Sequence, residues 1–228
     1  MSRLLLLAAL VLPLAAQSQA TGTTPRLVRA SGEGVVSVVP DRAKVLVGVV
    51  TQAATAQEAA AQNAAQLEAV LTQLRALLGA SADIKTINYS LTPNYRYPQG
   101  GGPPTLVNYT ASNTVEVTLA DLSSIGRVID AAAQAGANQI QSLRFTVADP
   151  EPLRARALAA AAKQARGRAE AIASGLGVRL GAVLTAEEGT VVRIADTREV
   201  SAGGTQTPIE TGLVEVRATV TVEIELAP

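Results

Sequence analysis

Residues 87–119 read INYSLTPNYRYPQGGGPPTLVNYTASNTVEVTL, two stretches of alternating apolar and polar residues separated by glycines and prolines. Alternation at every second residue places each set of side chains on its own face, so each stretch predicts a β-strand with one buried face. The segment 98–104 breaks both strands and joins them. We therefore expect a long antiparallel hairpin, with arms of roughly ten to fifteen residues and a tip that projects from the body.

The segments on either side of this hairpin complete an ordered series of strands and helices. Before it, a valine-rich strand is followed by a helix that Thr55 caps at its N-terminus and Gly79 ends. After it, Asp121 begins a shorter helix that ends at Gly136, and a further alternating strand follows. The order strand, helix, strand, strand, helix, strand over residues 42–147 predicts a ferredoxin-like βαββαβ unit.

The C-terminal part of the chain predicts a third helix and further strands. Residues 214–226 show the clearest alternation of the chain, with aliphatic side chains on one face and charged or threonine side chains on the other. Asp149 and Pro150 begin an alanine-rich helix, whose small side chains allow close packing on a sheet. The expected inner side of this helix comprises Leu153, Leu158, Ala161, Ala165, Ile172 and Leu176.

Together these elements predict an α+β fold built of two-layer sandwiches, with helices packed on mainly antiparallel sheets. The ferredoxin-like unit with its long hairpin is expected at 42–147. The N-terminal strand, the third helix and the C-terminal strands are expected to form a discontinuous α+β domain of residues 21–41 and 148–228.

Two short motifs near the N-terminus indicate special backbone positions. Gly32 and Gly34 have no helix directly behind them, so they predict a bulge or a close approach of another backbone rather than a phosphate-binding loop. Pro40 and Asp41 favour a tight turn between the first two strands. The strand that follows Pro40 could belong to either sheet.

Residues 1–20 have the features of a secretory signal peptide. Arg3 precedes an apolar run over 4–14, and the small residues Ser18 and Ala20 precede the expected cleavage after Ala20. The alternative is an N-terminal membrane anchor, but the apolar run is shorter than the roughly 20 residues that span a bilayer. We expect an exported protein that is located in the periplasm or secreted.

The composition excludes most catalytic and cofactor chemistry. The 228 residues contain no Cys, His or Trp, which excludes Ser-His-Asp triads, thiolate nucleophiles, disulfides and metals held by Cys or His. Glu187 and Glu188 are neighbours in a predicted strand and point to opposite faces, so they cannot flank one glycosidic bond. With 19 basic and 19 acidic residues, the chain lacks the basic surface typical of nucleic-acid binding. We predict no enzymatic activity, no cofactor and no metal.

Several motifs, in this order along the chain, resemble those of the SIMPL-domain family of exported bacterial proteins. They are Gly32-x-Gly34, Pro40-Asp41-x-Ala43, Thr86-x-Asn88-x-Ser90-Leu91-x-Pro93-x-Tyr95, Tyr109 to Asn113, Asp121-Leu122, Gly136-Ala137-Asn138-x-Ile140 and Pro208-Ile209-x-x-Gly212. The resemblance implies an immunogenic α+β protein of the periplasm or outer membrane. It also implies ring- or channel-like homo-oligomers in some members, and in some a link to oxidative-stress tolerance. It supplies no catalytic residue.

The four tyrosines of the chain all fall on the predicted hairpin. Tyr89, Tyr95, Tyr97 and Tyr109 flank the glycine- and proline-rich loop, and tyrosine is enriched in protein interfaces because it is large and amphipathic. They are the predicted interface residues for another subunit, a glycan or a peptide. The alternative is that Tyr89 and Tyr109 are cross-strand neighbours in the core, while Tyr95 and Tyr97 merely cover the hairpin.

The sequence thus favours a non-catalytic SIMPL-like protein that self-associates in the cell envelope, where it has a structural or stress-related role. The hairpin and exposed strand edges would supply the contacts between copies. The alternative function is a monomeric periplasmic binding module that uses the hairpin at 89–109 for a peptide or small ligand.

Overall fold

The computed structural model describes residues 26–79, 82–189, 194–197, 209 and 211–227. The expected signal peptide at 1–20 and its cleavage site lie outside these residues. The elements are β1 (Leu27–Val38), β2 (Arg42–Ala53), α1 (Ala56–Leu78), β3 (Asp83–Arg96), β4 (Thr105–Leu119), the 3-10 helix η1 (Leu122–Ser124), α2 (Ile125–Gln134), β5 (Gln139–Thr146), α3 (Glu151–Gly175), β6 (Arg179–Gly189), β7 (Ile194–Thr197) and β8 (Leu213–Ala227).

The strands form two antiparallel sheets, which confirms the predicted α+β fold. One sheet has the order β3-β4-β2-β5, and this is the strand order of a ferredoxin-like βαββαβ unit. The other has the order β1-β8-β6, and β7 also pairs with β8. The strand after Pro40 belongs to the first sheet, so residues 39–41 connect the two sheets instead of closing a hairpin. The domain division expected from the sequence stays a prediction.

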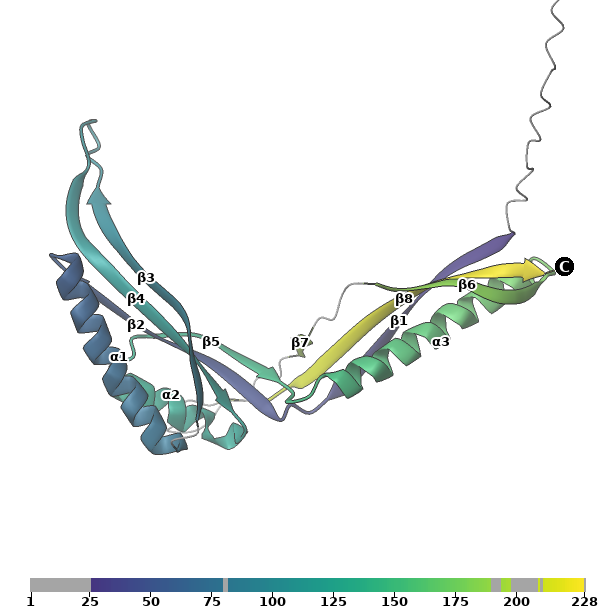
Figure 1. Cartoon of the computed structure of the whole chain (residues 1–228), viewed down its shortest axis with the longest axis horizontal. Helices are drawn as coiled ribbons and strands as arrows, with labels where there is room; N and C mark the ends of the chain where they lie inside the picture. Colours follow the sequence, from purple (N-terminus) through teal and green to yellow (C-terminus); the bar gives the residue numbers. More distant parts are fainter. Residues whose placement is uncertain (1–25, 80–81, 190–193, 198–208, 210, 228) are drawn as a thin grey trace, which may run out of the picture.

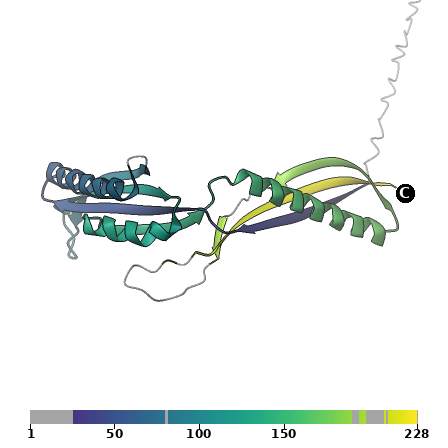
Figure 2. The ribbon, with the colours of Figure 1, turned by 90° about the horizontal axis from the view of Figure 1, so that it is seen from below.

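The two sheets lie in the two arms of an open, bent molecule (Figure 1). The helices α1 and α3 lie on the outer side of the bend, and the strands line its inner side. Seen from below, α1 and α2 pack along one sheet, while α3 runs along the other (Figure 2). The β3–β4 hairpin extends beyond the end of α1, so the predicted projecting tip is confirmed (Figure 1).

The first sheet is held to its helices by one continuous apolar core. The side chain of Thr55 accepts a hydrogen bond from the Glu58 amide at 3.2 Å, as its capping position predicts. Gly79 ends α1 with φ of 92°, a conformation that glycine adopts without strain. This core contains aliphatic residues from both helices and the sheet, among them Val45, Val47, Leu67, Val70, Leu74, Val115, Val117, Ile125 and Val128.

The second sheet packs against α3 through alanine and glycine. Every fourth residue of α3 is a buried alanine, namely Ala157, Ala161, Ala165, Ala169 and Ala173. A Cβ atom at Gly32 or Gly34 would overlap backbone atoms of α3, so both glycines are required for this close approach. The strand pairing of β1 with β8 is regular through both positions, so the motif marks a close approach and not a bulge.

The prediction for the inner side of α3 is confirmed in part. Ala161 and Ala165 are buried and Leu153 and Leu158 are half-buried, but Ile172 and Leu176 are 44% and 64% exposed. The helix lies so close to β1 that only alanine fits at its centre, and this turns bulky residues of its C-terminal part outward. The start of α3 also differs slightly from the prediction that Asp149 and Pro150 begin the helix. Asp149 accepts a hydrogen bond from the Glu151 amide at 3.1 Å, and the helix begins at Glu151.

Asp41 ties together the two segments through which the chain passes between the sheets. Its amide donates to the carbonyl of Thr146 at 3.2 Å, and its Oδ1 accepts the amide of Ala148 at 2.7 Å. One residue of the first connection therefore holds the start of the second, which restrains the angle between the arms.

A Gly32→Ala substitution is expected to destabilise the protein by about 1–3 kcal/mol, the usual cost of an overpacked contact, because the new methyl group meets the backbone of α3. Urea unfolding measures the change. The matched control is Gly167→Ala in α3, where the new Cβ meets nothing within 4 Å, and where alanine should stabilise the helix by about 1 kcal/mol. Equal effects of the two substitutions would contradict the close-packing account.

Removal of the Asp41 carboxylate is expected to loosen the bend. In Asp41→Ala the Ala148 amide loses its side-chain acceptor, so small-angle scattering should show a broader distribution of interatomic distances, with little change in secondary structure by circular dichroism. The control Asp41→Asn keeps an Oδ1 acceptor and should scatter like the wild type. An unchanged profile for Asp41→Ala would show that packing alone sets the angle.

Candidate functional site

The β3–β4 hairpin is the candidate functional site. Its pairing runs from Asp83 opposite Thr118 to Arg96 opposite Thr105. The neighbouring strand β2 stops at Ala53, which lies opposite Tyr109. The last residues of the hairpin therefore continue as a two-stranded ribbon without a third strand beside them.

The structure exposes three of the four predicted interface tyrosines. Tyr89, Tyr95 and Tyr97 are 52%, 48% and 73% exposed, and Tyr109 is half-buried. Tyr89 lies opposite Asn113 and Tyr109 lies opposite Pro93, so these two tyrosines are not direct cross-strand partners. Their role as an interface stays a prediction.

The expectation of one buried face along both arms is wrong for β3, which has no buried residue. The helix α1 packs mainly on β2 and β4, and β3 lies at the edge of the sheet beyond it. The consequence is a strip of exposed large side chains, and some of them, such as Ile87, Leu91 and Val107, were expected on the buried face. Besides the tyrosines, this exposed strip contains Ile87, Leu91, Leu106 and Val107.

The hairpin is also almost free of charge. From Thr86 to Val115 the only charged residue is Arg96, whereas 17% of the whole chain is charged. Exposed apolar side chains on a projecting, charge-poor segment are typical of surfaces that contact a partner.

The free edge of β3 is interrupted at two places. The pairing with β4 shifts between Thr86 and Asn88, which leaves Ile87 in an irregular position, and Pro93 has no N–H to offer a partner strand. Bulges and prolines of this kind hinder continuous strand addition. Contacts at this edge would therefore depend on side chains more than on backbone pairing.

The edge of β1 is protected differently. Gln164 of α3 accepts the Glu33 amide at 2.8 Å, and Arg168 of α3 donates to the Ser31 carbonyl at 2.7 Å. Among the described hydrogen bonds, no side chain caps the backbone of β3 in this way. This contrast marks β3 as the more available edge.

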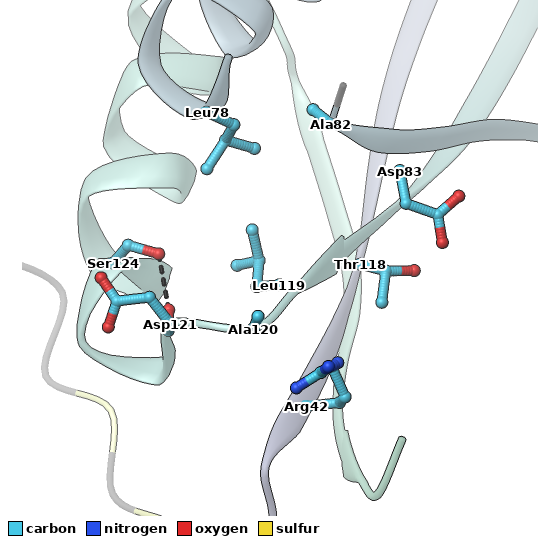
Figure 3. Close-up of a pocket in the computed structure, with 9 residues that line it drawn as sticks. All are labelled: Arg42, Leu78, Ala82, Asp83, Thr118, Leu119, Ala120, Asp121 and Ser124. Carbon is cyan, nitrogen blue, oxygen red and sulfur yellow. Dashed lines mark hydrogen bonds between the residues drawn. The ribbon is translucent and has the colours of Figure 1, made fainter. Parts of the chain in front are cut away.

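A shallow hollow of about 430 Å³ lies at the opposite end of the same sheet, near the bend (Figure 3). Leu78 and Leu119 point into its middle, while the carboxylates of Asp83 and Asp121 lie on opposite sides of it. The polar groups that line it thus do not converge on one point, as an acid–base pair would require. The lining residues are Arg42, Leu78, Ala82, Asp83, Thr118, Leu119, Ala120, Asp121 and Ser124.

Both carboxylates of this hollow are engaged in local hydrogen bonds. Hydrogen bonds from the side chains of Lys85 and then Thr118 lower the pKa of Asp83. The hydroxyl of Ser123, followed by its amide, lowers the pKa of Asp121. Both groups are therefore held in their charged form, which suits local capping and ion pairing and does not suit a general acid.

The described residues contain neither a candidate metal site nor a helix that could span a membrane. Across these ranges no group of three or more acidic residues is arranged to hold a metal ion. Nor does any helix within them combine the length and hydropathy needed to cross a bilayer. Glu187 and Glu188 lie opposite Thr221 and Val220 on β8, as neighbours that face different sides of the sheet.

Comparison with known proteins places the chain in one family. The profile of the SIMPL family, described as a protein of unknown function (DUF541), matches residues 28–224. The 26 kDa periplasmic immunogenic protein of Brucella melitensis is 29% identical over 190 residues, which is 82% of this chain and 76% of that protein. Uncharacterized protein YggE of Escherichia coli strain K12 is 35% identical over 173 residues, which is 75% of this chain and 68% of that protein.

The lowered pKa of Asp121 predicts a pH-dependent contribution to stability. Because the folded pKa lies below the ordinary value of 3.8, the contribution is present above pH 3.8 and is lost as the pH falls through the folded value. The melting temperature of Asp121→Asn should therefore fall below that of the wild type at neutral pH, and the two should converge in strong acid. A difference that stays constant with pH would show that charge at Asp121 is irrelevant.

Proposed function

Because the chain belongs to the SIMPL family, as the motifs predicted, we propose that it is a non-catalytic protein of the cell envelope that self-associates through the β3–β4 hairpin. The observation that carries this proposal is the exposed strip of the hairpin, where Tyr89, Tyr95 and Tyr97 lie beside aliphatic residues on a nearly uncharged, projecting segment. The first function to test is therefore assembly.

The proposed location is the periplasm or the medium. A relative from Brucella melitensis carries the word periplasmic in its name, and the signal-like segment at 1–20 supports export with cleavage near Ala20. An association with the cell envelope and a link to stress tolerance are part of the proposal, and they depend on the family resemblance.

The mode of assembly follows from the edge of β3. The irregularity at Ile87 and the missing N–H at Pro93 leave only short uninterrupted stretches of backbone. Tyrosine and leucine side chains supply large contact areas, and tyrosine loses little conformational entropy on binding. We expect copies to meet through the exposed strip, with backbone pairing as a minor part.

The absence of catalysis is also a proposal. The chain has no His and no Cys, and the carboxylates Asp83 and Asp121 around the hollow of the described structure point away from one another. Both findings support the proposal, because the usual acid–base pairs need such groups to converge on one point.

Sedimentation of the exported chain tests the assembly. We expect an oligomer at micromolar concentration, and we expect Tyr95→Ser with Tyr97→Ser to raise its dissociation constant by about tenfold or more, which corresponds to a loss of about 1.4 kcal/mol. The control Leu176→Ser removes a similarly exposed apolar side chain directly after α3, in the other arm, and should leave the mass unchanged.

The chain also provides its own optical probe of this contact. With no Trp, and with every tyrosine on the hairpin, intrinsic tyrosine emission reports on the hairpin alone, so it should change with protein concentration over the same range as the mass. A wild-type monomer at micromolar concentration, or a mass unaffected by the double substitution, would contradict the proposal. The monomer result would favour a binding module that uses the hairpin at 89–109.

A further inference from the structure

The face of the β3-β4-β2-β5 sheet that α1 and α2 leave uncovered carries a cluster of amide side chains. We call it the amide face and define it by Gln52, Asn94, Asn108, Thr110, Gln139 and Gln141. It is the opposite face from the core, because along β4 Ala111, Val115 and Val117 are buried, and Thr110, directly before Ala111, points to the other side of the strand.

Cross-strand hydrogen bonds fix one half of the amide face near the hairpin. The amide nitrogen of Asn94 donates to Oδ1 of Asn108 and to the hydroxyl of Thr110, both at 2.6 Å. The amide nitrogen of Asn108 donates in turn to Oε1 of Gln52 at 3.2 Å. Three strands thus contribute to one ordered row of polar groups.

A second row lies across the middle of the sheet. The amide nitrogen of Gln141 donates to the hydroxyl of Thr114 at 3.0 Å and to Oε1 of Gln139 at 3.2 Å. Strand β2 lies between β4 and β5 and has Gly48 beside these side chains. A Cβ atom at Gly48 would lie 3.2 Å from the Cβ atom of Gln139. The glycine leaves room for the glutamines to extend across β2.

The amide face consists of uncharged side chains, whereas the uncovered face of the second sheet carries charged ones. There Arg217 pairs with Glu33 at 3.0 Å and with Glu215 at 2.8 Å, and Arg29 approaches Glu223 at 3.9 Å. On the first sheet, the ion pair of Lys44 with Glu116 lies below the amide face, and Arg96 follows two residues after Asn94 on β3. The middle of the uncovered face is thus crossed by ion pairs in the second sheet, whereas the six residues of the amide face are all neutral.

The ordered amides leave a mixed set of donors and acceptors directed outward. Asn94 uses both amide hydrogens within its row and retains Oδ1 as an acceptor. Among the described residues, the amide nitrogens of Gln52 and Gln139 have no hydrogen-bond acceptor. Asparagine is also unfavourable in strands, so its repeated use here departs from what the fold alone requires.

We propose that the amide face binds a neutral glycan. A neutral glycan presents hydroxyl and acetamido groups that both donate and accept hydrogen bonds, and it carries no charge that would need an ionic partner. Side chains already ordered by cross-strand hydrogen bonds lose little further freedom when they bind such a ligand. The site is independent of the proposed self-association, because Leu91 of the exposed strip lies opposite Ala111, on the helix side of the sheet.

Calorimetry of the full chain with a tetramer of N-acetylglucosamine tests this site, with a tetramer of glucose as a second neutral probe. We expect saturable binding that changes little between low and high salt, since the glycan carries no charge. Gln52→Ala with Gln139→Ala should weaken it by about tenfold or more. Both side chains are exposed, so the fold should be retained.

The matched control is Gln62→Ala on the exposed side of α1, which should bind like the wild type. A second variant, Gln52→Glu with Gln139→Glu, keeps the size of both side chains and should also weaken binding. The proposal is overturned if neither neutral tetramer binds, if Gln62→Ala weakens binding as much as the double variant, or if only an acidic glycan binds in a salt-sensitive manner. Sedimentation of the same samples reports on self-association separately.

Discussion

The helices of this protein are narrower than the sheets on which they pack, and most of its surface chemistry depends on this limit. Helix α1 contacts β2 and β4 closely and reaches β3 only at its margin. In the other arm α3 covers β1 and β8 but contacts β6 much less. A strand that lies beyond its helix has no core to face, whatever its sequence pattern. The exposed strip on β3 is the direct result.

The second arm achieves its coverage by an unusually close approach. Alanines at every fourth position of α3 meet Gly32 and Gly34 of β1, so the gain in stability comes from intimate contact between backbones and not from large side chains. The same proximity lets Gln164 and Arg168 reach the free edge of β1. The close contact of α3 with β1 thus both stabilises this sheet and protects its edge. Among the described hydrogen bonds, no side chain caps the free edge of β3 in the same way.

The hairpin arm therefore carries two chemically different surfaces on opposite sides of the same strands. The helix side presents tyrosine and aliphatic residues, which favour contact with another apolar surface. The uncovered side presents amides and hydroxyls held in rows by hydrogen bonds such as those of Asn94. Because alternate residues of a strand point to opposite faces, assembly on one side and ligand binding on the other can coexist. Asp41 at the bend influences how both surfaces are presented, since it joins the two connections between the arms.

The sequence by itself determined the elements, the α+β class, the projecting hairpin and the family, because these depend on periodicity, capping residues such as Thr55, and local motifs. It also predicted that Gly32 and Gly34 mark either a bulge or a close approach of another backbone, and the structure decided for the close approach. Only the tertiary structure decided which apolar faces are buried: Ile87, Leu91 and Ile172 have the spacing of core residues, yet they are exposed. The physical reason is that alternation states which side chains share a face, whereas burial depends on whether a helix reaches that face. The rows of the amide face likewise join residues of different strands, so register and not local sequence brings them together.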